Sequence, residues 1–197
     1  MTLWRSPRGD GTAATAAPPL PRSSPLSAGS PPELALRAWT EDLYVSGFIY
    51  GWVRLSDALN QREPLRVEQA RVHGLRSASW LPRADGQLVV DPFDLEFVLG
   101  YPLARTEAEH DARRIHKVRF PVLIEGQDFE VTGTMHVFPG NAPEYATHRS
   151  GQLFLPITEA SVTRNQRLVS DRYTDVALVN RYAIRRIRQL DSPPSRH

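Results

Sequence analysis

Cysteine is absent from this chain, which excludes disulfide bonds and metal sites built from thiolates. No apolar run approaches the ~20 residues that a membrane-spanning helix needs. The N-terminal segment is too polar for a secretory signal, because Pro18 and Pro19 interrupt its apolar stretch. We therefore expect a cytoplasmic protein. A transit peptide is the alternative, since this segment contains arginine, serine and alanine and almost no acid.

Recognisable catalytic motifs are missing as well. The sequence has no GxSxG, P-loop, GxGxxG or HExxH pattern. The nearest group of metal-ligand residue types, His110, Asp111 and His116, does not share one helical face and so predicts no metal site. The carboxylates Glu107 and Glu109 lie in a polar segment where nothing would tune them for acid–base catalysis. We expect no catalytic residue, metal or cofactor, and an enzyme with an unrecognised site is kept as one alternative.

Large apolar side chains are rare at the N-terminus, where seven prolines precede Glu33. Such a stretch buries too little surface to offset the entropy of ordering it. We therefore predict a disordered leader over residues 1–33. The rest of the chain, with ordinary hydrophobic and charged content, is predicted to form a first repeat at 34–105, a helical linker at 106–117, a second repeat at 118–190 and a tail at 191–197.

Lysine is nearly absent, and the positive charge is carried by arginine. The formal net charge is only +2, yet arginines gather toward the C-terminus, where Asp191 is the one acid near them. A local basic patch suits an anionic partner such as nucleic acid. The alternative is a solvated strand with no ligand. The anion-binding candidates are Arg181, Arg185, Arg186 and Arg188.

An internal repeat is the strongest pattern in the sequence. Residues 36–51 align with 122–137 without a gap, residues 65–72 match 155–162, and residues 94–98 match 175–179. Gly47 and Gly133 fall at the same place within their copies. Glycine weakens a strand unless a bend or a close backbone approach requires it, so both positions predict a bent strand.

Each copy is expected to contain five short strands. In the first they cover 36–40, 43–50, 65–72, 95–99 and 101–103; in the second they cover 122–124, 129–137, 153–162, 176–179 and 182–187. A capped helical turn is expected at 54–60 and a helical linker at 106–115. Five short strands joined mostly by turns favour a small closed or nearly closed barrel. The predicted fold is therefore mainly all-β, with two tandem five-stranded barrels.

The two copies differ on one face of their second strand. The first copy carries aromatic residues there, namely Tyr44, Phe48, Tyr50 and, with a shift of register, Trp52. The second copy carries Glu130, Thr134 and His136 at the equivalent positions. Three explanations stay open for the aromatic face. It packs inside the chain, it forms an oligomer or partner interface, or it stacks nucleic-acid bases.

The pattern resembles the Sm-like family of small RNA-associated barrels. The resemblance rests on Gly47 in the second strand, on the segment from Asp57 to Asn60, on the strand at 65–70 and on the apolar segment at 97–103. It implies an Sm-like or SH3-like barrel for each copy, and it implies that Asp57 and Asn60 are candidates for contact with a base. An uncharacterised bacterial relative with paired barrels is an equal alternative.

Together these features predict a non-catalytic binding or assembly module that recognises a protein partner or a second copy of itself. The alternative is binding of RNA or another single-stranded nucleic acid through the arginine-rich last strand and the aromatic face. No membrane partner is expected. Salt separates the two functions, because binding through several arginines weakens steeply as salt rises, whereas binding through an apolar interface hardly responds.

Overall fold

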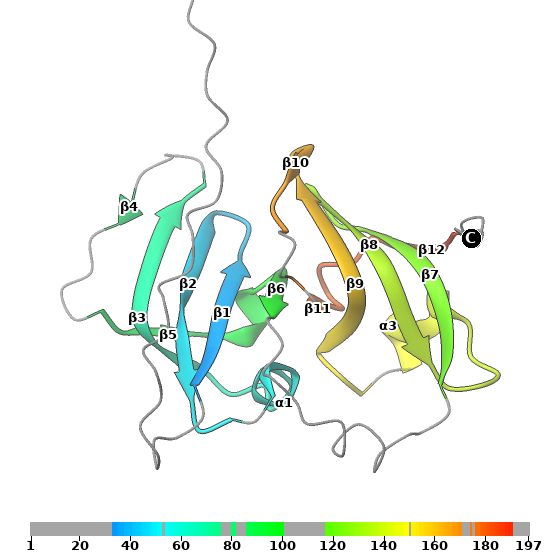
Figure 1. Cartoon of the computed structure of the whole chain (residues 1–197), viewed down its shortest axis with the longest axis horizontal. Coiled ribbons are helices and arrows are strands. Elements are labelled where there is room, and N and C mark those ends of the chain that lie inside the picture. The colour runs from blue at the N-terminus through cyan, green and yellow to red at the C-terminus, as the bar shows by residue number, and fades with distance from the viewer. Residues whose placement is uncertain are drawn as a thin grey trace, which may run out of the picture.

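A computed structural model describes residues 33–52, 54–75, 80–81, 86–100, 117–149, 151–170, 174 and 176–190 (Figure 1). The predicted leader up to residue 32, the helical linker at 106–115, the short strand at 101–103 and the tail at 191–197 lie outside these residues. So do His110, Asp111 and His116.

The described chain is mainly β, as predicted, and every strand pair is antiparallel. The first half contains β1 (Glu33–Trp39), β2 (Leu43–Tyr50), α1 (Leu55–Asn60), β3 (Leu65–Gly74), β4 (Trp80–Leu81), β5 (Leu88–Val90), η1 (Pro92–Asp94) and β6 (Phe97–Gly100). The second half contains β7 (Val118–Glu125), β8 (Phe129–Val137), η2 (Pro143–Tyr145), α3 (Ala146–Arg149), β9 (Phe154–Arg164), β10 (Arg167–Leu168), β11 (Val176–Asn180) and β12 (Arg186–Gln189).

The strands form one large sheet in the order β12-β7-β8-β9-β11-β6-β1-β2-β3-β4, with β10 on β9 and β5 on β3. Among the described strands this sheet has two ends, so the closed barrels expected for the two copies are not found. Figure 1 shows instead two strongly curved halves side by side, with β6 and β11 between them. The physical reason is that β6, the last strand of the first half, pairs with β1 on one side and with β11 of the second half on the other.

The turn between β1 and β2 forms where the sequence predicts it. The Thr40 hydroxyl accepts hydrogen bonds from the backbone N–H groups of Asp42 (3.2 Å) and Leu43 (3.0 Å). The Thr40 N–H in turn donates to the Leu43 carbonyl at 2.9 Å. A side-chain oxygen that satisfies turn N–H groups is the usual reason for threonine at such a position.

Each half of the described chain has a β-bulge at one of the two aligned glycines, Gly47 and Gly133. The pairing of β2 with β3 shifts register between Ser46 and Phe48, and that of β8 with β9 shifts between Thr132 and Thr134. The two bulges therefore lie at equivalent places, one at each repeated glycine. Opposite them, β3 and β9 each contain a residue with positive φ, Gln69 at 51° and Glu159 at 53°.

The third match of the repeat is wrong. Leu65 pairs with Val90 of β5, whereas its equivalent Leu155 pairs with Val179 of β11, so β5 and not β6 corresponds to β11. By the same reasoning β6 corresponds to β12, since β6 pairs with β1 and β12 pairs with β7. The segments 94–98 and 175–179 look alike because β6 and β11 are neighbouring buried strands, and short buried strands share an apolar composition.

Pairing of β6 with β11 joins the two halves of the molecule. Phe97 lies opposite Val179 and Gly100 opposite Val176. The Phe97 ring also packs between the two halves, 4.8 Å from Trp39 and 5.0 Å from Phe129 between ring centroids. Each of the two hydrophobic clusters contains residues from both halves. The halves therefore share their cores.

A buried arginine reinforces this junction. The Arg164 side chain, 4% exposed, forms ion pairs of 2.8 Å with Glu96 of the first half and Asp128 of the second. It also donates hydrogen bonds of 2.9 Å to the carbonyls of Thr40 and Glu41. Burial raises the pKa of Glu96, and the favourable charge of Arg164 offsets only part of that rise.

Adding a methyl group at either repeated glycine should destabilise the fold. A Cβ atom at Gly47 would lie 2.6 Å from the Glu68 carbonyl oxygen, and one at Gly133 would lie 2.7 Å from that of Thr158. We expect Gly47→Ala and Gly133→Ala each to lower the free energy of unfolding by about 1–3 kcal/mol, measured by chemical denaturation. Gly151→Ala is the control, because its Cβ would meet nothing within 4 Å. Equal stability of all three variants would contradict the bent-strand account.

Glu96 should give stability a pH dependence of defined sign. Its raised pKa means that the folded state binds this proton more tightly than the unfolded state does. Between the unfolded value of 4.5 and the raised folded value, the contribution of Glu96 to stability therefore grows as the pH falls. We expect wild type to gain stability relative to Glu96→Gln when denaturation is measured from pH 8 down to 4.5. A difference that stays constant or shrinks on acidification would overturn this assignment.

Candidate functional site

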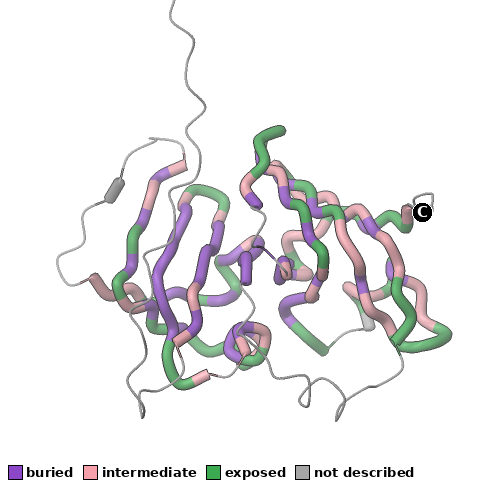
Figure 2. The backbone as a smooth tube through the Cα atoms, viewed as in Figure 1, coloured by how far each residue is buried: buried purple, intermediate pink, exposed green. Residues whose placement is uncertain are grey.

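The predicted aromatic face lies largely inside the protein. Tyr44 is 3% exposed and Phe48 is 1% exposed, while Tyr50 at the strand end is 37% exposed. Trp52 is partly buried against the first hydrophobic cluster. Figure 2 shows β1 and β2 buried along most of their length, whereas β8 alternates between buried and accessible residues.

Tyr44 packs across the junction between the halves. Its ring centroid lies 4.8 Å from that of Trp39, and both rings belong to the cluster that holds the second half's core residues, Val131 among them. This position favours packing inside the chain over the other two explanations, because a base or a partner needs an accessible ring. β8 shows the two-residue alternation of a half-buried strand, with Val131 buried and Thr132 exposed.

Asp57 and Asn60 both lie on α1, as predicted for the helical turn, but Asn60 is used within the structure. Its side-chain oxygen accepts a hydrogen bond from the Phe154 N–H at 2.9 Å, and its amide donates to the Ser56 carbonyl at 2.8 Å. Asn60 therefore ties α1 to β9. Asp57 is exposed. The expected side-chain cap is not found, because Arg54, the N-cap residue before Leu55, makes no capping hydrogen bond with its side chain.

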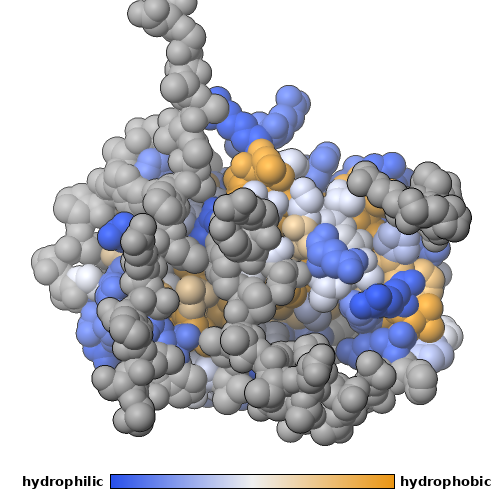
Figure 3. Space-filling model, viewed as in Figure 1, coloured by the Kyte–Doolittle hydropathy of each residue, from blue (hydrophilic) through white to orange (hydrophobic). Residues whose placement is uncertain are grey.

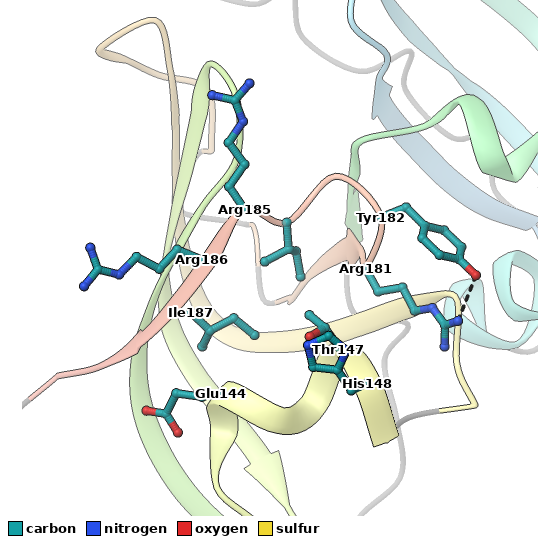
Figure 4. Close-up of a pocket in the computed structure, with 9 residues that line it drawn as sticks. Glu144, Thr147, His148, Arg181, Tyr182, Arg185, Arg186 and Ile187 are labelled. Atoms are coloured by element: carbon teal, nitrogen blue, oxygen red, sulfur yellow. Dashed lines mark hydrogen bonds between the residues drawn. The ribbon is translucent and has the colours of Figure 1, made fainter.

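Three of the four predicted arginines line one pocket of about 530 Å³ (Figure 4). One side of the pocket comes from η2 and α3, and the other comes from the turn after β11 and from β12. The structure therefore brings together residues 144–148 and 181–187, which are far apart in the sequence. The lining residues are Glu144, Thr147, His148, Arg181, Tyr182, Ile184, Arg185, Arg186 and Ile187.

The guanidinium groups surround the pocket rather than fill it. In Figure 4, Arg185 and Arg186 extend away from the centre toward solvent, and Arg181 extends toward Tyr182. Two of these arginines have weak partners at the surface. Arg185 donates a 2.9 Å hydrogen bond to the neutral Gln127 side chain, and the Glu125 carboxylate lies 4.0 Å from Arg186. Exposed ion pairs of this kind are weak, so these guanidinium groups can exchange their partners for an anionic ligand.

Arg188 lies on β12, as Arg186 does, but it is not part of the pocket lining. It pairs with Glu125 at 3.1 Å. Because β12 alternates, Ile187 points into the core while Arg186 and Arg188 stay accessible. The last strand therefore extends the basic surface beyond the pocket, and among the described residues Glu144 is the only acid that lines the pocket.

A second polar area, on β8 and β9, has internal partners for its main side chains. The Thr134 hydroxyl donates to Glu159 at 2.9 Å, and His136 Nε2 lies 2.9 Å from the Thr158 hydroxyl. Partial burial, together with Arg119 and Lys117, lowers the pKa of His136. This area resembles an ordinary hydrated sheet face, and Figure 3 shows such hydrophilic residues over both halves beside smaller apolar areas.

Sequence reasoning missed the part of the pocket formed by η2 and α3. Thr147 and His148 come from the long loop that replaces α1 in the second copy, so the repeat offers no template for them. Tyr182 was read as part of a strand, but residues 181–183 form a turn. The available signal was the extra length of residues 139–151 relative to the first copy.

The described residues contain neither a metal-binding cluster nor a membrane-spanning helix. No group of three histidine, aspartate or glutamate side chains converges in a way that could hold a metal ion. No helix in the described part of the chain has the length and apolarity to span a membrane. Comparison with protein-family models, with curated proteins and with solved structures finds no match to this chain.

The buried position of Phe48 leads to a stability prediction. Replacing a fully buried aromatic ring typically costs about 3–5 kcal/mol, and Phe48→Ser should lower the free energy of unfolding by that amount. Tyr50→Ser is the matched control on the same strand, and it should cost less than half as much because Tyr50 is 37% exposed. Thermal and chemical denaturation measure both. An unchanged midpoint for Phe48→Ser would show that this ring does not contribute to the core.

Proposed function

We propose that this protein is a non-catalytic module that binds nucleic acid through the arginine-lined pocket and the adjoining β12 strand. The observation that carries the proposal is that Arg181, Arg185 and Arg186 all line one pocket. Planar guanidinium groups match the geometry of phosphate oxygens and form charge-assisted hydrogen bonds with them.

The arrangement of these arginines suits a chain of phosphates better than a single enclosed one. Arg185 and Arg186 point outward in different directions, and Arg188 continues the basic row along β12. A nucleic-acid backbone carries repeated charges and can contact such a row at several points. Tyr44 and Phe48 are buried inside the chain, so these two rings of the predicted aromatic face are not accessible to a ligand or partner.

We also propose that the two halves are diverged copies of a small Sm-like β unit. The order β6-β1-β2-β3-β5 in the first half equals β12-β7-β8-β9-β11 in the second, and the bulge at the glycine is shared. These features support a common ancestral unit. The candidate base contact at Asn60 is not part of this proposal, since that side chain bonds β9.

Self-association is the second candidate function, and one observation favours it. In the first half β6 pairs on both sides, with β1 and β11, whereas among the described strands its counterpart β12 pairs with β7 alone. An edge strand of this kind can pair with another chain. Arg186 and Arg188, which occupy the places of Phe97 and Leu99, make an apolar contact there less favourable.

Removing two arginines at the pocket should weaken binding and flatten its salt dependence. We expect Arg185→Ala combined with Arg186→Ala to lower the affinity for a fluorescent 20-nucleotide oligonucleotide about 10- to 100-fold at low salt. The slope of log affinity against log salt should fall by about 2, because each lost phosphate contact removes close to one unit. Fluorescence anisotropy from 50 to 300 mM salt measures both quantities.

The matched control is Arg66→Ala combined with Arg71→Ala, which removes the same charge from exposed positions on β3. It should leave the slope nearly unchanged, since β3 lies in the first half, away from the pocket. An equal loss in both double variants would mean that binding follows net charge rather than this site. A wild-type protein that does not bind the oligonucleotide, and whose elution volume depends on its concentration, would favour self-association instead.

A further inference from the structure

Two accessible aromatic rings lie beside each other where the halves of the molecule meet. Phe93 of η1 is 48% exposed and Tyr182, in the turn after β11, is 65% exposed. Their ring centroids are 6.3 Å apart and their planes differ by 27°. Large exposed apolar rings are unfavourable in water, and two adjacent ones commonly mark a contact surface.

A single buried side chain holds the segments that carry these two rings. Asn180 is 1% exposed, and its amide donates a 2.7 Å hydrogen bond to the Leu95 carbonyl just after η1. Its side-chain oxygen accepts a 3.0 Å hydrogen bond from the Tyr182 N–H. Its backbone N–H donates to the Glu96 carbonyl at 2.9 Å. Asn180 therefore fixes the turn of the second half against the loop of the first, and both rings project from this fixed frame.

The aromatic pair adjoins the basic pocket. Tyr182 is itself a lining residue, and the Arg181 guanidinium lies 4.7 Å from the Tyr182 ring centroid and donates a 2.8 Å hydrogen bond to its hydroxyl. A ring next to several guanidinium groups offers a stacking surface and a charge of the sign that attracts phosphate. Neither half has this combination alone, because Phe93 comes from the first and Tyr182 from the second.

We propose that Phe93 and Tyr182 form a composite stacking site for an unpaired base of the nucleic acid whose phosphates the arginines contact. This inference rests on the proposed function of the pocket. It adds a preference for single strands, because the faces of bases in a duplex are already stacked and cannot reach a protein ring. The rings stack without reading base edges, so the site tolerates different bases.

The test uses three probes on the full chain: a single-stranded 20-mer, its duplex, and inorganic polyphosphate as a probe of charge alone. Wild type should bind the single strand more tightly than the duplex. Tyr182→Leu should lower single-strand affinity on the order of 5- to 150-fold, the value of one stacked base, and leave polyphosphate affinity within about twofold. Tyr182→Phe keeps the ring and should retain most of the single-strand affinity.

A double-variant comparison tests whether the two rings act as one site. Phe93→Leu should weaken single-strand binding, and the loss in Phe93→Leu with Tyr182→Leu should be smaller than the product of the single losses. Tyr50→Leu is the control, because Tyr50 is a partly exposed ring that does not line the pocket. It should bind like wild type. All these residues are accessible, so the variants should fold; thermal denaturation verifies this.

The outcomes separate the two proposals. If Tyr182→Leu and Phe93→Leu bind both polyphosphate and the single strand as tightly as wild type does, the stacking site is overturned. The proposal for the basic pocket then still stands. Equal affinity of wild type for the single strand and the duplex would also overturn the stacking site. Failure of wild type to bind any of the three probes would overturn the proposed function itself, and the stacking site with it.

Discussion

Antiparallel pairing of β6 with β11 is the interaction on which the rest of the molecule depends. It joins the two halves into a single sheet and places residues of each half in both hydrophobic clusters. Buried backbone groups of β6 and β11 would otherwise lack hydrogen-bond partners, at a cost of about 1–3 kcal/mol each. Phe97 fills the space between Trp39 and Phe129, and Arg164 joins carboxylates from both halves. The two repeats are therefore expected to unfold together rather than as separate domains.

This shared junction places corresponding strands of the two halves in different surroundings. β6 and β12 hold equivalent places, yet β6 carries Phe97 and Leu99 where β12 carries Arg186 and Arg188. β6 has a neighbouring strand on both sides and must be apolar. β12 lies at the end of the described sheet and tolerates charge. The same difference applies to Phe48 on β2 and Thr134 on β8, since Phe48 is fully buried and Thr134 is partly accessible. The side chains at these corresponding positions thus differ as their surroundings differ.

Features with local physical causes were predictable from the sequence. The turn at Thr40, the alternation of β8 and the bends at Gly47 and Gly133 each depend on neighbouring residues or on a glycine that no other residue replaces without a clash. The basic character of β12 was also predictable, because four arginines lie close together. What failed was the assignment of 94–98 to 175–179, since two short buried runs look alike whether they are equivalent strands or neighbours.

The pocket and the aromatic pair show a different limit of sequence reasoning. The predicted aromatic face was sought where aromatic residues are dense, from Tyr44 to Trp52, and those rings serve mainly the core. Phe93 and Tyr182 are single aromatics in separate segments, and nothing local connects them.

The site that contains both rings depends on three long-range features that the sequence does not reveal. They are the pairing of β6 with β11, the packing of η2 and α3 at the pocket, and the hydrogen bonds of the Asn180 side chain. The sequence around Asn180 does not mark it as a junction residue. A buried amide with donors and acceptors on both sides must be fully paired, and here its partners lie in both halves. An accessible site that forms only where the two halves meet would require both of them, since neither alone presents the rings and the arginines together.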